Sequence, residues 1–148
     1  MRKLTKGQSL IEVLVSITIV VMLAVSLITT TLITQKTSRS ARDNTVAAKL
    51  AQEYIEQARV IRDNKGFSAI SDGCYVINGS DPNTWQLVSC VPGDKPVLNN
   101  VTFTRKIDVS GRNDKSKQVK VTVNWTDSSG TRTVTNTTIL SDCVSTSC

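Results

Sequence analysis

One carboxylate in this sequence lies within an apolar run, where burial of its charge costs free energy. Glu12 sits inside an apolar run, with Leu10 and Ile11 before it and Val13 after it. An ionised carboxylate within a membrane costs about 2.5–3.5 kcal/mol on insertion scales unless a cation pairs with it. No Lys or Arg occurs within the following 23 residues. The partner must therefore come from the chain's own N-terminal end or from another molecule.

Composition argues against an enzyme. The chain has 148 residues and no histidine, so the commonest general base and the commonest metal ligand are both missing. No nucleophile is accompanied by a candidate base, and we expect no catalytic residue, no metal site and no cofactor. The length allows one small domain with an appendage, but not two full cores.

The four cysteines are Cys74, Cys90, Cys143 and Cys148, and they form no CxxC pair. Outside the cytoplasm we expect disulfides, for which four cysteines allow three connectivities. We favour Cys74–Cys90 and Cys143–Cys148, because both pairings are local. A redox or catalytic thiol is disfavoured, since no activating base is in evidence.

An uncharged apolar run defines the first structural element. Residues 13–33 contain no charge, and a helix of these 21 residues spans about 31 Å, close to the hydrocarbon thickness of a bilayer. Its Ser and Thr hydroxyls can bond to carbonyls one turn back. The run is too long for a typical secretory signal, and we expect an uncleaved single-pass anchor.

Basic residues flank this run on both sides. The positive-inside rule places the N-terminus in the cytoplasm, but three positive charges on the far side weaken the bias. The preceding cluster is Arg2, Lys3 and Lys6, and the following cluster is Lys36, Arg39 and Arg42.

The helix is expected to continue as an amphipathic segment. Apolar residues recur at three- and four-residue steps between positions 43 and 62, and no proline occurs from Gln8 to Asp81. Asn64 and Gly66 provide a stop signal. The apolar positions are Val46, Ala47, Leu50, Ala51, Tyr54, Ile55, Ala58 and Ile61.

The remainder is rich in β-forming residues. We expect strands at 74–77, 85–90, 101–109, 118–125 and 131–140, separated by turns at 78–79, 81–83, 92–94, 110–113 and 127–130. The last three strands should form an antiparallel meander with one face on the amphipathic helix. The predicted fold class is α+β: a long N-terminal helix, half membrane and half amphipathic, packed on a small antiparallel sheet.

The sequence KGQSLIEVLV at residues 6–15 resembles the prepilin signature of type IV pilins and type II secretion pseudopilins. The resemblance implies that a prepilin peptidase cuts between Gly7 and Gln8 and then N-methylates Gln8. It also implies that Glu12, the fifth residue of the mature chain, pairs with the α-amine of a neighbouring subunit. Such a pair neutralises two buried charges and sets axial register, because a misplaced subunit leaves both unpaired.

A second stretch, AKLAQEYIEQAR at residues 48–59, is similar to the minor pilin subgroup that includes the type IV pilus assembly protein V and the pseudopilin type labelled I. The pilin resemblance implies a leader at 1–7, a transmembrane and filament-core helix at 8–35, an amphipathic continuation at 36–65 and a β-rich head at 66–148. A terminal cystine loop at Cys143 and Cys148 is similar to that of many pilin heads.

The function implied is that of a minor pilin or pseudopilin, a structural subunit of a type IV pilus, competence or type II secretion filament. Its partners would be the prepilin peptidase, other subunits, and inner-membrane lipid before assembly. The precursor would cross the inner membrane once, with its N-terminus cytoplasmic and its head extracytoplasmic. The alternative is a non-polymerising single-pass anchored binding protein, either an adhesin or a DNA receptor.

A basic stretch at 105–132 raises the question of DNA contact. It holds seven basic residues and three aspartates, which could touch phosphates weakly. We favour a solvated surface, because no interleaved aromatic residues are present to stack bases. The basic residues are Arg105, Lys106, Arg112, Lys115, Lys117, Lys120 and Arg132, and the aspartates are Asp108, Asp114 and Asp127.

Overall fold

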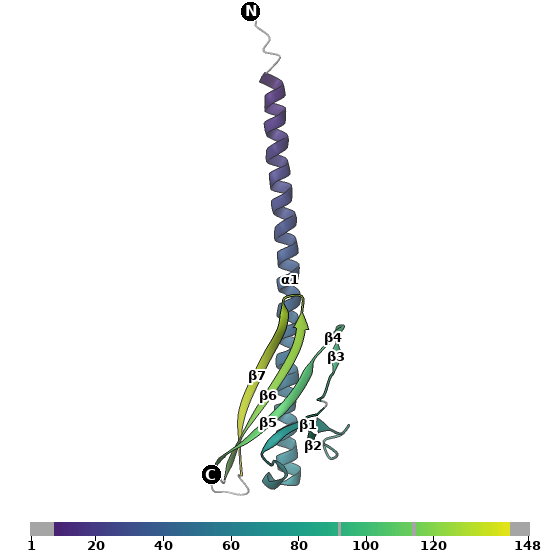
Figure 1. Cartoon of the computed structure of the whole chain (residues 1–148), viewed down its shortest axis with the longest axis vertical. Helices are drawn as coiled ribbons and strands as arrows, with labels where there is room; N and C mark the ends of the chain where they lie inside the picture. Colours follow the sequence, from purple (N-terminus) through teal and green to yellow (C-terminus); the bar gives the residue numbers. More distant parts are fainter. Residues whose placement is uncertain (1–7, 92, 114, 143–148) are drawn as a thin grey trace, which may run out of the picture. The chain divides into compact units, whose positions relative to one another are not determined.

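A computed structural model describes residues 8–91, 93–113 and 115–142 of the chain. The chain divides into two compact units, Met1–Ala41 and Arg42–Cys148. A single helix, α1 (Gln8–Lys65), supplies the described part of the first unit and the beginning of the second (Figure 1). The predicted uninterrupted helix is confirmed, as is its stop: the Gly66 N–H donates to the Arg62 carbonyl at 2.8 Å.

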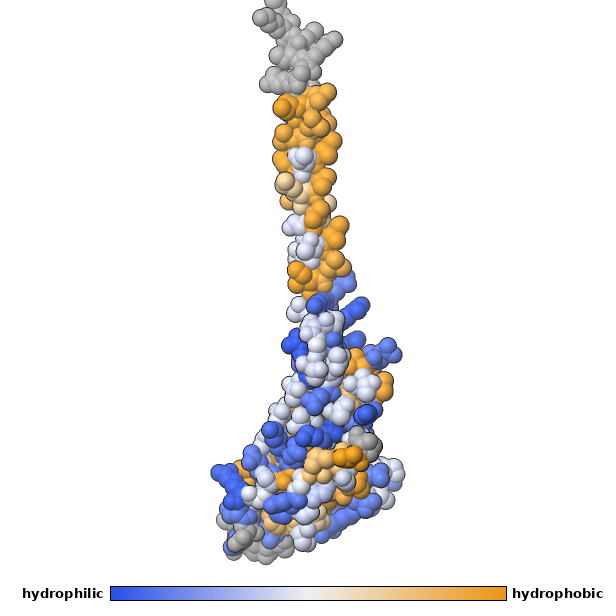
Figure 2. Space-filling view, viewed as in Figure 1, coloured by the Kyte–Doolittle hydropathy of each residue, from blue (hydrophilic) through white to orange (hydrophobic). Residues whose placement is uncertain are grey.

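The first unit is apolar on its surface. The large apolar side chains from Leu10 to Ile33 are between 52% and 73% exposed, and they form the orange surface in Figure 2. By length and composition, this helix is able to cross a membrane.

The second unit contains a five-stranded antiparallel sheet with strand order β2-β1-β5-β6-β7. The meander of the last three strands is confirmed, with Ile107 opposite Val121 and Val121 opposite Asn136. The strands are β1 (Gly73–Asn78), β2 (Gln86–Ser89), β5 (Thr104–Asn113), β6 (Ser116–Asp127) and β7 (Gly130–Ser141).

The core lies between one face of this sheet and the C-terminal part of α1. Alternate residues of β6 are fully buried, as the period of two along a strand requires, and the apolar stripe of α1 packs against them. The buried residues of α1 are Ala47, Leu50, Ala51, Tyr54, Ile55, Ala58 and Ile61; those of β5 and β6 include Ile107, Val109, Val119, Val121, Val123 and Trp125.

Two short elements depart from the prediction of one strand at 101–109. The segment is split into β4 (Val101–Thr102) and β5, and β4 pairs with an unpredicted strand, β3 (Val97–Leu98). Phe103 lies between them: its side chain is fully buried and its N–H donates to the Pro96 carbonyl at 2.9 Å. A 3₁₀ turn, Phe67–Ala69, follows α1.

The predicted turn at 110–113 is wrong. Strand β5 continues through Asn113, with a register shift between Gly111 and Asn113. The chain reverses between Asn113 and its pairing partner Ser116, and the Asn113 Oδ1 accepts from the Lys115 N–H at 3.1 Å and the Ser116 hydroxyl at 2.7 Å. An Asn side chain that bonds its own backbone two residues on favours a turn there, whereas the glycine is absorbed as an irregularity of the strand.

Candidate functional site

The N-terminal end of α1 holds the residues singled out by the signature. Gln8 is the first helical residue, and Glu12 follows four residues later, about 6 Å along the axis and on the same side of the helix. Glu12 is exposed, and no cation lies within ion-pair distance of its carboxylate in the part of the chain that the structure describes. Gly7 lies outside the described residues. Cleavage after Gly7, methylation of Gln8 and pairing of Glu12 stay predictions.

Six hydroxyl groups of the described part of the first unit donate to carbonyls of the helix itself: those of Ser16, Thr18, Thr29, Thr30, Thr31 and Thr34. The Ser16 hydroxyl donates to the Glu12 carbonyl at 2.7 Å, Thr29 to the Val25 carbonyl at 2.7 Å, and Thr30 to Ser26 at 2.9 Å. These bonds let the hydroxyls enter an apolar environment without an unpaired donor. The Glu12 carboxylate has no such partner within the described helix, and burial of its charge would require a cation from elsewhere.

In the second unit, the side chain of Arg105 is the centre of a charged cluster. Arg105 is only 14% exposed and forms an ion pair with Asp94 through its Nε and with Glu53 through its Nη1, at 3.5 Å. Its guanidinium lies 4.0 Å from the centroid of the Tyr54 ring. The Tyr54 hydroxyl donates to the Asp94 Oδ2 at 2.6 Å. This cluster ties the loop before β3 to α1 and β5.

The pKa values of two groups in the cluster, Tyr54 and Asp94, are shifted in opposite directions. Burial raises the pKa of the Tyr54 phenol above its usual range, and the hydrogen bond to Asp94 raises it further. Burial also acts to raise the pKa of Asp94, but hydrogen bonds from Tyr54 and Arg105, with the charge of Arg105, outweigh it and hold that pKa below its ordinary value. Both shifts keep Asp94 charged and Tyr54 neutral at neutral pH.

The basic stretch at 105–132 is largely neutralised within the chain. Besides Arg105, Lys106 pairs with Asp108 at 3.1 Å, Lys117 with Asp72 at 3.5 Å, and Arg132 with Asp127 at 3.3 Å. Lys117 also donates to the Ile70 carbonyl. Four of the seven basic side chains thus already have carboxylate partners, and the structure does not support a DNA contact. The remaining basic residues are Arg112, Lys115 and Lys120; Asp114 lies outside the described residues.

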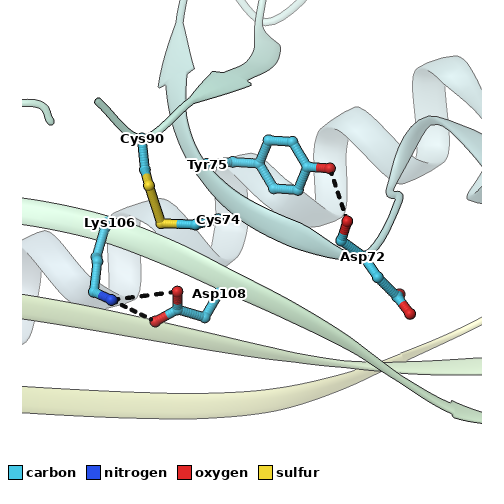
Figure 3. Close-up of a disulfide and its surroundings, with 6 residues drawn as sticks. All are labelled: Asp72, Cys74, Tyr75, Cys90, Lys106 and Asp108. Atoms are coloured by element: carbon cyan, nitrogen blue, oxygen red, sulfur yellow. Dashed lines mark hydrogen bonds and ion pairs between the residues drawn. A yellow bond between two sulfur atoms is a disulfide. The ribbon is translucent and has the colours of Figure 1, made fainter. Parts of the chain in front are cut away.

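The disulfide Cys74–Cys90 confirms one of the two predicted pairings (Figure 3). It joins β1 to the residue after β2, with the two Cα atoms 5.4 Å apart, and the Cys90 N–H donates to the Cys74 carbonyl at 3.3 Å. Figure 3 shows it beside the ion pair of Lys106 and Asp108. Cys143 and Cys148 lie outside the described residues, so their pairing stays a prediction.

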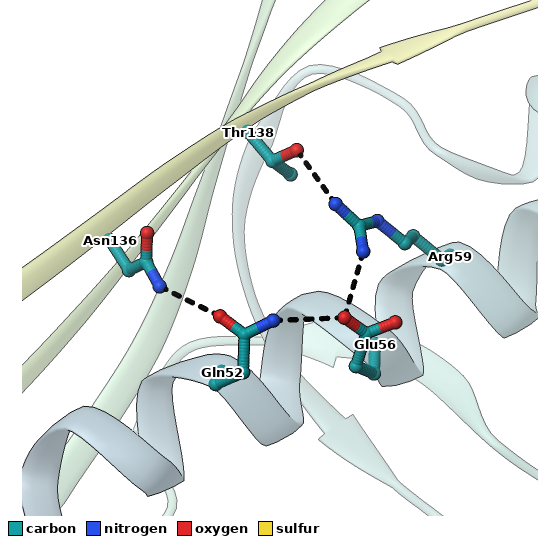
Figure 4. Close-up of polar contacts among 5 residues, drawn as sticks. All are labelled: Gln52, Glu56, Arg59, Asn136 and Thr138. Atoms are coloured by element: carbon teal, nitrogen blue, oxygen red, sulfur yellow. Dashed lines mark hydrogen bonds and ion pairs between the residues drawn. The ribbon is translucent and has the colours of Figure 1, made fainter.

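Sequence reasoning missed a set of polar links between α1 and β7 (Figure 4). The Gln52 Oε1 accepts from the Asn136 amide at 3.0 Å, and Arg59 donates to the Thr138 hydroxyl at 3.3 Å. On the helix, the Glu56 carboxylate accepts from both Gln52 and Arg59. The spacing of Gln52, Glu56 and Arg59 predicts that they share one helix face and contact one another. It does not predict which residues of β7 they contact.

No metal centre is evident in the described ranges, where no group of three or more His, Cys, Asp and Glu side chains is placed to hold an ion. Two features therefore remain as candidate functional sites: the N-terminal end of α1 and the surface of the head.

Comparison with known proteins bears on the first of these features. Residues 2–28 match the family model described as the prokaryotic N-terminal methylation motif. No curated protein and no solved structure matches the chain. The motif implies processing by a prepilin peptidase and assembly with other pilin subunits, and it points to a structural rather than an enzymatic protein. Together with the apolar helix, it is consistent with a membrane-anchored precursor that crosses the bilayer once. The match thus supports a place for this chain among the type IV pilin-like and pseudopilin proteins.

Proposed function

We propose that this chain is a minor pilin or pseudopilin that is cut after Gly7, N-methylated at Gln8 and inserted into a filament through residues 8–35. The observation that carries the proposal is the match of residues 2–28 to the methylation motif, on a helix whose large apolar side chains from Leu10 to Ile33 are exposed. The stretch at 48–59 supports the subgroup of the assembly protein V and the pseudopilin labelled I.

The chemistry of assembly rests on two charges. Cleavage frees the α-amine of Gln8, which enters an apolar helix bundle and needs a carboxylate, while no cation of the described residues lies within ion-pair distance of Glu12. Pairing the amine of one subunit with Glu12 of a neighbour removes both penalties at once. A shifted subunit would leave both charges unpaired, so the pair also fixes axial register.

The proposal includes a layout for the precursor. The leader at 1–7 stays in the cytoplasm, the segment at 8–35 lies in the membrane before assembly, the amphipathic segment at 36–65 continues it, and the head at 66–148 faces away from the cytoplasm. The disulfide Cys74–Cys90 supports this orientation, because disulfides persist in oxidising compartments.

The first test is the mass of the N-terminal peptide of the protein purified from its native membranes. We expect a chain that begins at N-methyl-Gln8. A variant with Gly7→Val should remain unprocessed, because the residue before the cut is the one that the peptidase recognises. A native chain that keeps Met1 to Gly7, or that is cut elsewhere, would overturn the proposal in favour of the anchored binding protein.

The second test separates a filament subunit from a plain anchor. Glu12→Gln keeps the shape of the side chain and removes the charge. We expect its incorporation into sheared filaments to fall by at least about tenfold, equivalent to about 1.4 kcal/mol, with membrane insertion retained. Thr18→Val, six residues further along the same helix, is the matched control and should incorporate normally. Equal incorporation of the two variants would contradict a role of Glu12 in assembly.

A further inference from the structure

The head contains a cavity that the assembly model does not use. Its volume is about 420 Å³, which is within the roughly 300–1,000 Å³ typical of small-molecule sites. Its lining comes from three stretches: Lys95 with the turn and second strand of the β3–β4 hairpin, the first residue of β5, and the parts of β6 and β7 next to the hairpin that joins them. Figure 1 shows the β3–β4 hairpin beside the five-stranded sheet.

Most of the lining can form hydrogen bonds. Four threonines contribute hydroxyls that both donate and accept: Thr102, Thr104, Thr126 and Thr131. Asn100 and Asn124 add amides. The Asn124 Oδ1 already accepts from the Thr133 hydroxyl at 2.8 Å, so its N–H groups are the part left for a ligand. Such a wall suits a molecule with several hydroxyl groups.

The charge of the cavity is positive. Lys95 is the charged residue among the described lining residues, and it is exposed. Its neighbour Asp94 does not neutralise it, because the Asp94 carboxylate is held by Tyr54 and Arg105. A single ammonium group can pair with one carboxylate of a ligand and would leave any further negative charge without a partner.

Two lining residues provide apolar contact. Val101 and Trp125 belong to the same wall, and the buried Trp125 Nε1 has no acceptor within the described part of the chain. That nitrogen is itself buried, so a ligand in the cavity would not reach it, and Trp125 contributes apolar surface only. Rings with apolar C–H faces and hydroxyl edges match such a mixed wall.

We propose that this cavity binds a sugar acid, a hydroxylated ring with one carboxylate, either free or at the end of a glycan. The carboxylate would pair with Lys95, the ring hydroxyls would bond to the threonines and asparagines, and the ring would contact Val101 and Trp125. The proposal is independent of filament assembly, because no residue of α1 lines the cavity among those described.

The test uses the full-length protein in detergent with Trp85→Phe, which leaves Trp125 as the single tryptophan of the two in the chain. Titration with D-glucuronate should change the Trp125 fluorescence and saturate with a dissociation constant on the order of 1 mM. D-Glucose, which lacks the charge, and acetate, which lacks the hydroxyls, should each bind at least about tenfold more weakly. Calorimetric titration gives a second readout that does not depend on the indole.

Substitutions locate the binding. Lys95→Met should weaken binding of D-glucuronate by about tenfold or more, since a charge-assisted bond is lost, and Thr131→Val should weaken it about threefold. Lys120→Met, at an exposed lysine of β6 outside the cavity, is the matched control and should bind as the parent does. Near-ultraviolet circular dichroism checks that each variant keeps its fold.

Three results would overturn the proposal: no heat and no saturable fluorescence change with D-glucuronate, equal binding of D-glucose or acetate, or equal effects of Lys95→Met and Lys120→Met. Supporting results also separate the two sources of the ligand. Tighter binding of an oligosaccharide that ends in glucuronate assigns the site to a glycan terminus, whereas weaker binding assigns it to the free acid.

Discussion

At Arg105, one side chain on the inner face of the sheet carries a charge into the core. Its neighbours on that face, Phe103 and Ile107, are fully buried, so Arg105 interrupts an apolar row. The partners of Arg105 could not be predicted from the sequence. Asp94 lies 11 residues away in a loop, and Tyr54, which donates to that aspartate, precedes it by 40 residues. Only the folded chain shows that the interruption is a paired charge.

We predict that Asp94→Asn destabilises the head by about 2 kcal/mol, because it leaves a mostly buried guanidinium with the more distant Glu53 as its remaining carboxylate. Asp108→Asn is the matched control. That carboxylate pairs with Lys106, and both side chains are more than a third exposed, so the cost should stay below about 1 kcal/mol. Denaturant unfolding of the full-length variants, followed by tryptophan fluorescence, measures both. Equal losses would contradict a special role of the Arg105 cluster.

The same carboxylate makes stability depend on acid pH. The pKa of Asp94 is lower in the folded state than the ordinary value of about 3.9, so the unfolded state binds more protons in acid. Its contribution is fully present above that ordinary value and is lost as the pH falls through the folded pKa. The difference in unfolding free energy between the parent and Asp94→Asn should therefore shrink as the pH is lowered from 7 to 3. A constant difference would show that the carboxylate is not the group responsible.

Among the elements, those with a long, regular pattern were predicted well. Helix α1 follows from an apolar stripe without proline, and β6 follows from Val119, Val121 and Val123. Strand β3 has only two residues, too few for a periodic pattern to show. The break at Phe103 was not visible either, because its backbone bond to Pro96 depends on that unpredicted hairpin.

The end of α1 provides a prediction about backbone conformation. Gly66 has φ +84° and ψ 163°, a region that is essentially restricted to glycine. A Cβ there would meet the Ser68 Oγ at an ordinary van der Waals distance of 3.9 Å. The backbone conformation, and not a steric clash, therefore limits substitution at this position. We expect Gly66→Ala to lower the free energy of unfolding by about 1–3 kcal/mol, as measured by denaturant unfolding. Ser68→Ala, at an exposed neighbour, should change it by less than about 0.5 kcal/mol. Tolerance of alanine at both positions would contradict the strained conformation.

For the whole molecule, the boundary between the two compact units lies within α1, between Ala41 and Arg42. The helix therefore serves two environments. Its first part exposes apolar side chains, and its second part contributes seven buried residues to the core of the head. The N-terminal motif could be recognised from sequence because its residues are contiguous, whereas the cavity could not, since its walls come from three stretches that only the fold brings together.

This division predicts which fragments fold. A fragment that begins at Arg42 should be soluble and unfold cooperatively, because it keeps the part of α1 that packs on the sheet. A fragment that begins at Gly66 loses Tyr54, Ile55 and Ile61 from the core and should not fold, since about 80 residues bury too little surface alone. Circular dichroism and denaturant unfolding of the two fragments test this. A cooperatively folded shorter fragment would show that the sheet does not need the helix.

The position of β7 at the edge of the sheet also sets the order in which the head opens. Among the described strands, β7 pairs only with β6, whereas β6 pairs on both sides, with β5 and β7. Its links to α1 include the side-chain bonds of Asn136 and Thr138, which water can replace. Local opening should therefore release β7 while β5 and β6 stay paired. In hydrogen-exchange measurements, the β6 amides of Val121 and Val123 should exchange only on global unfolding, and those of β7 earlier, so that the head frays from its last strand inward.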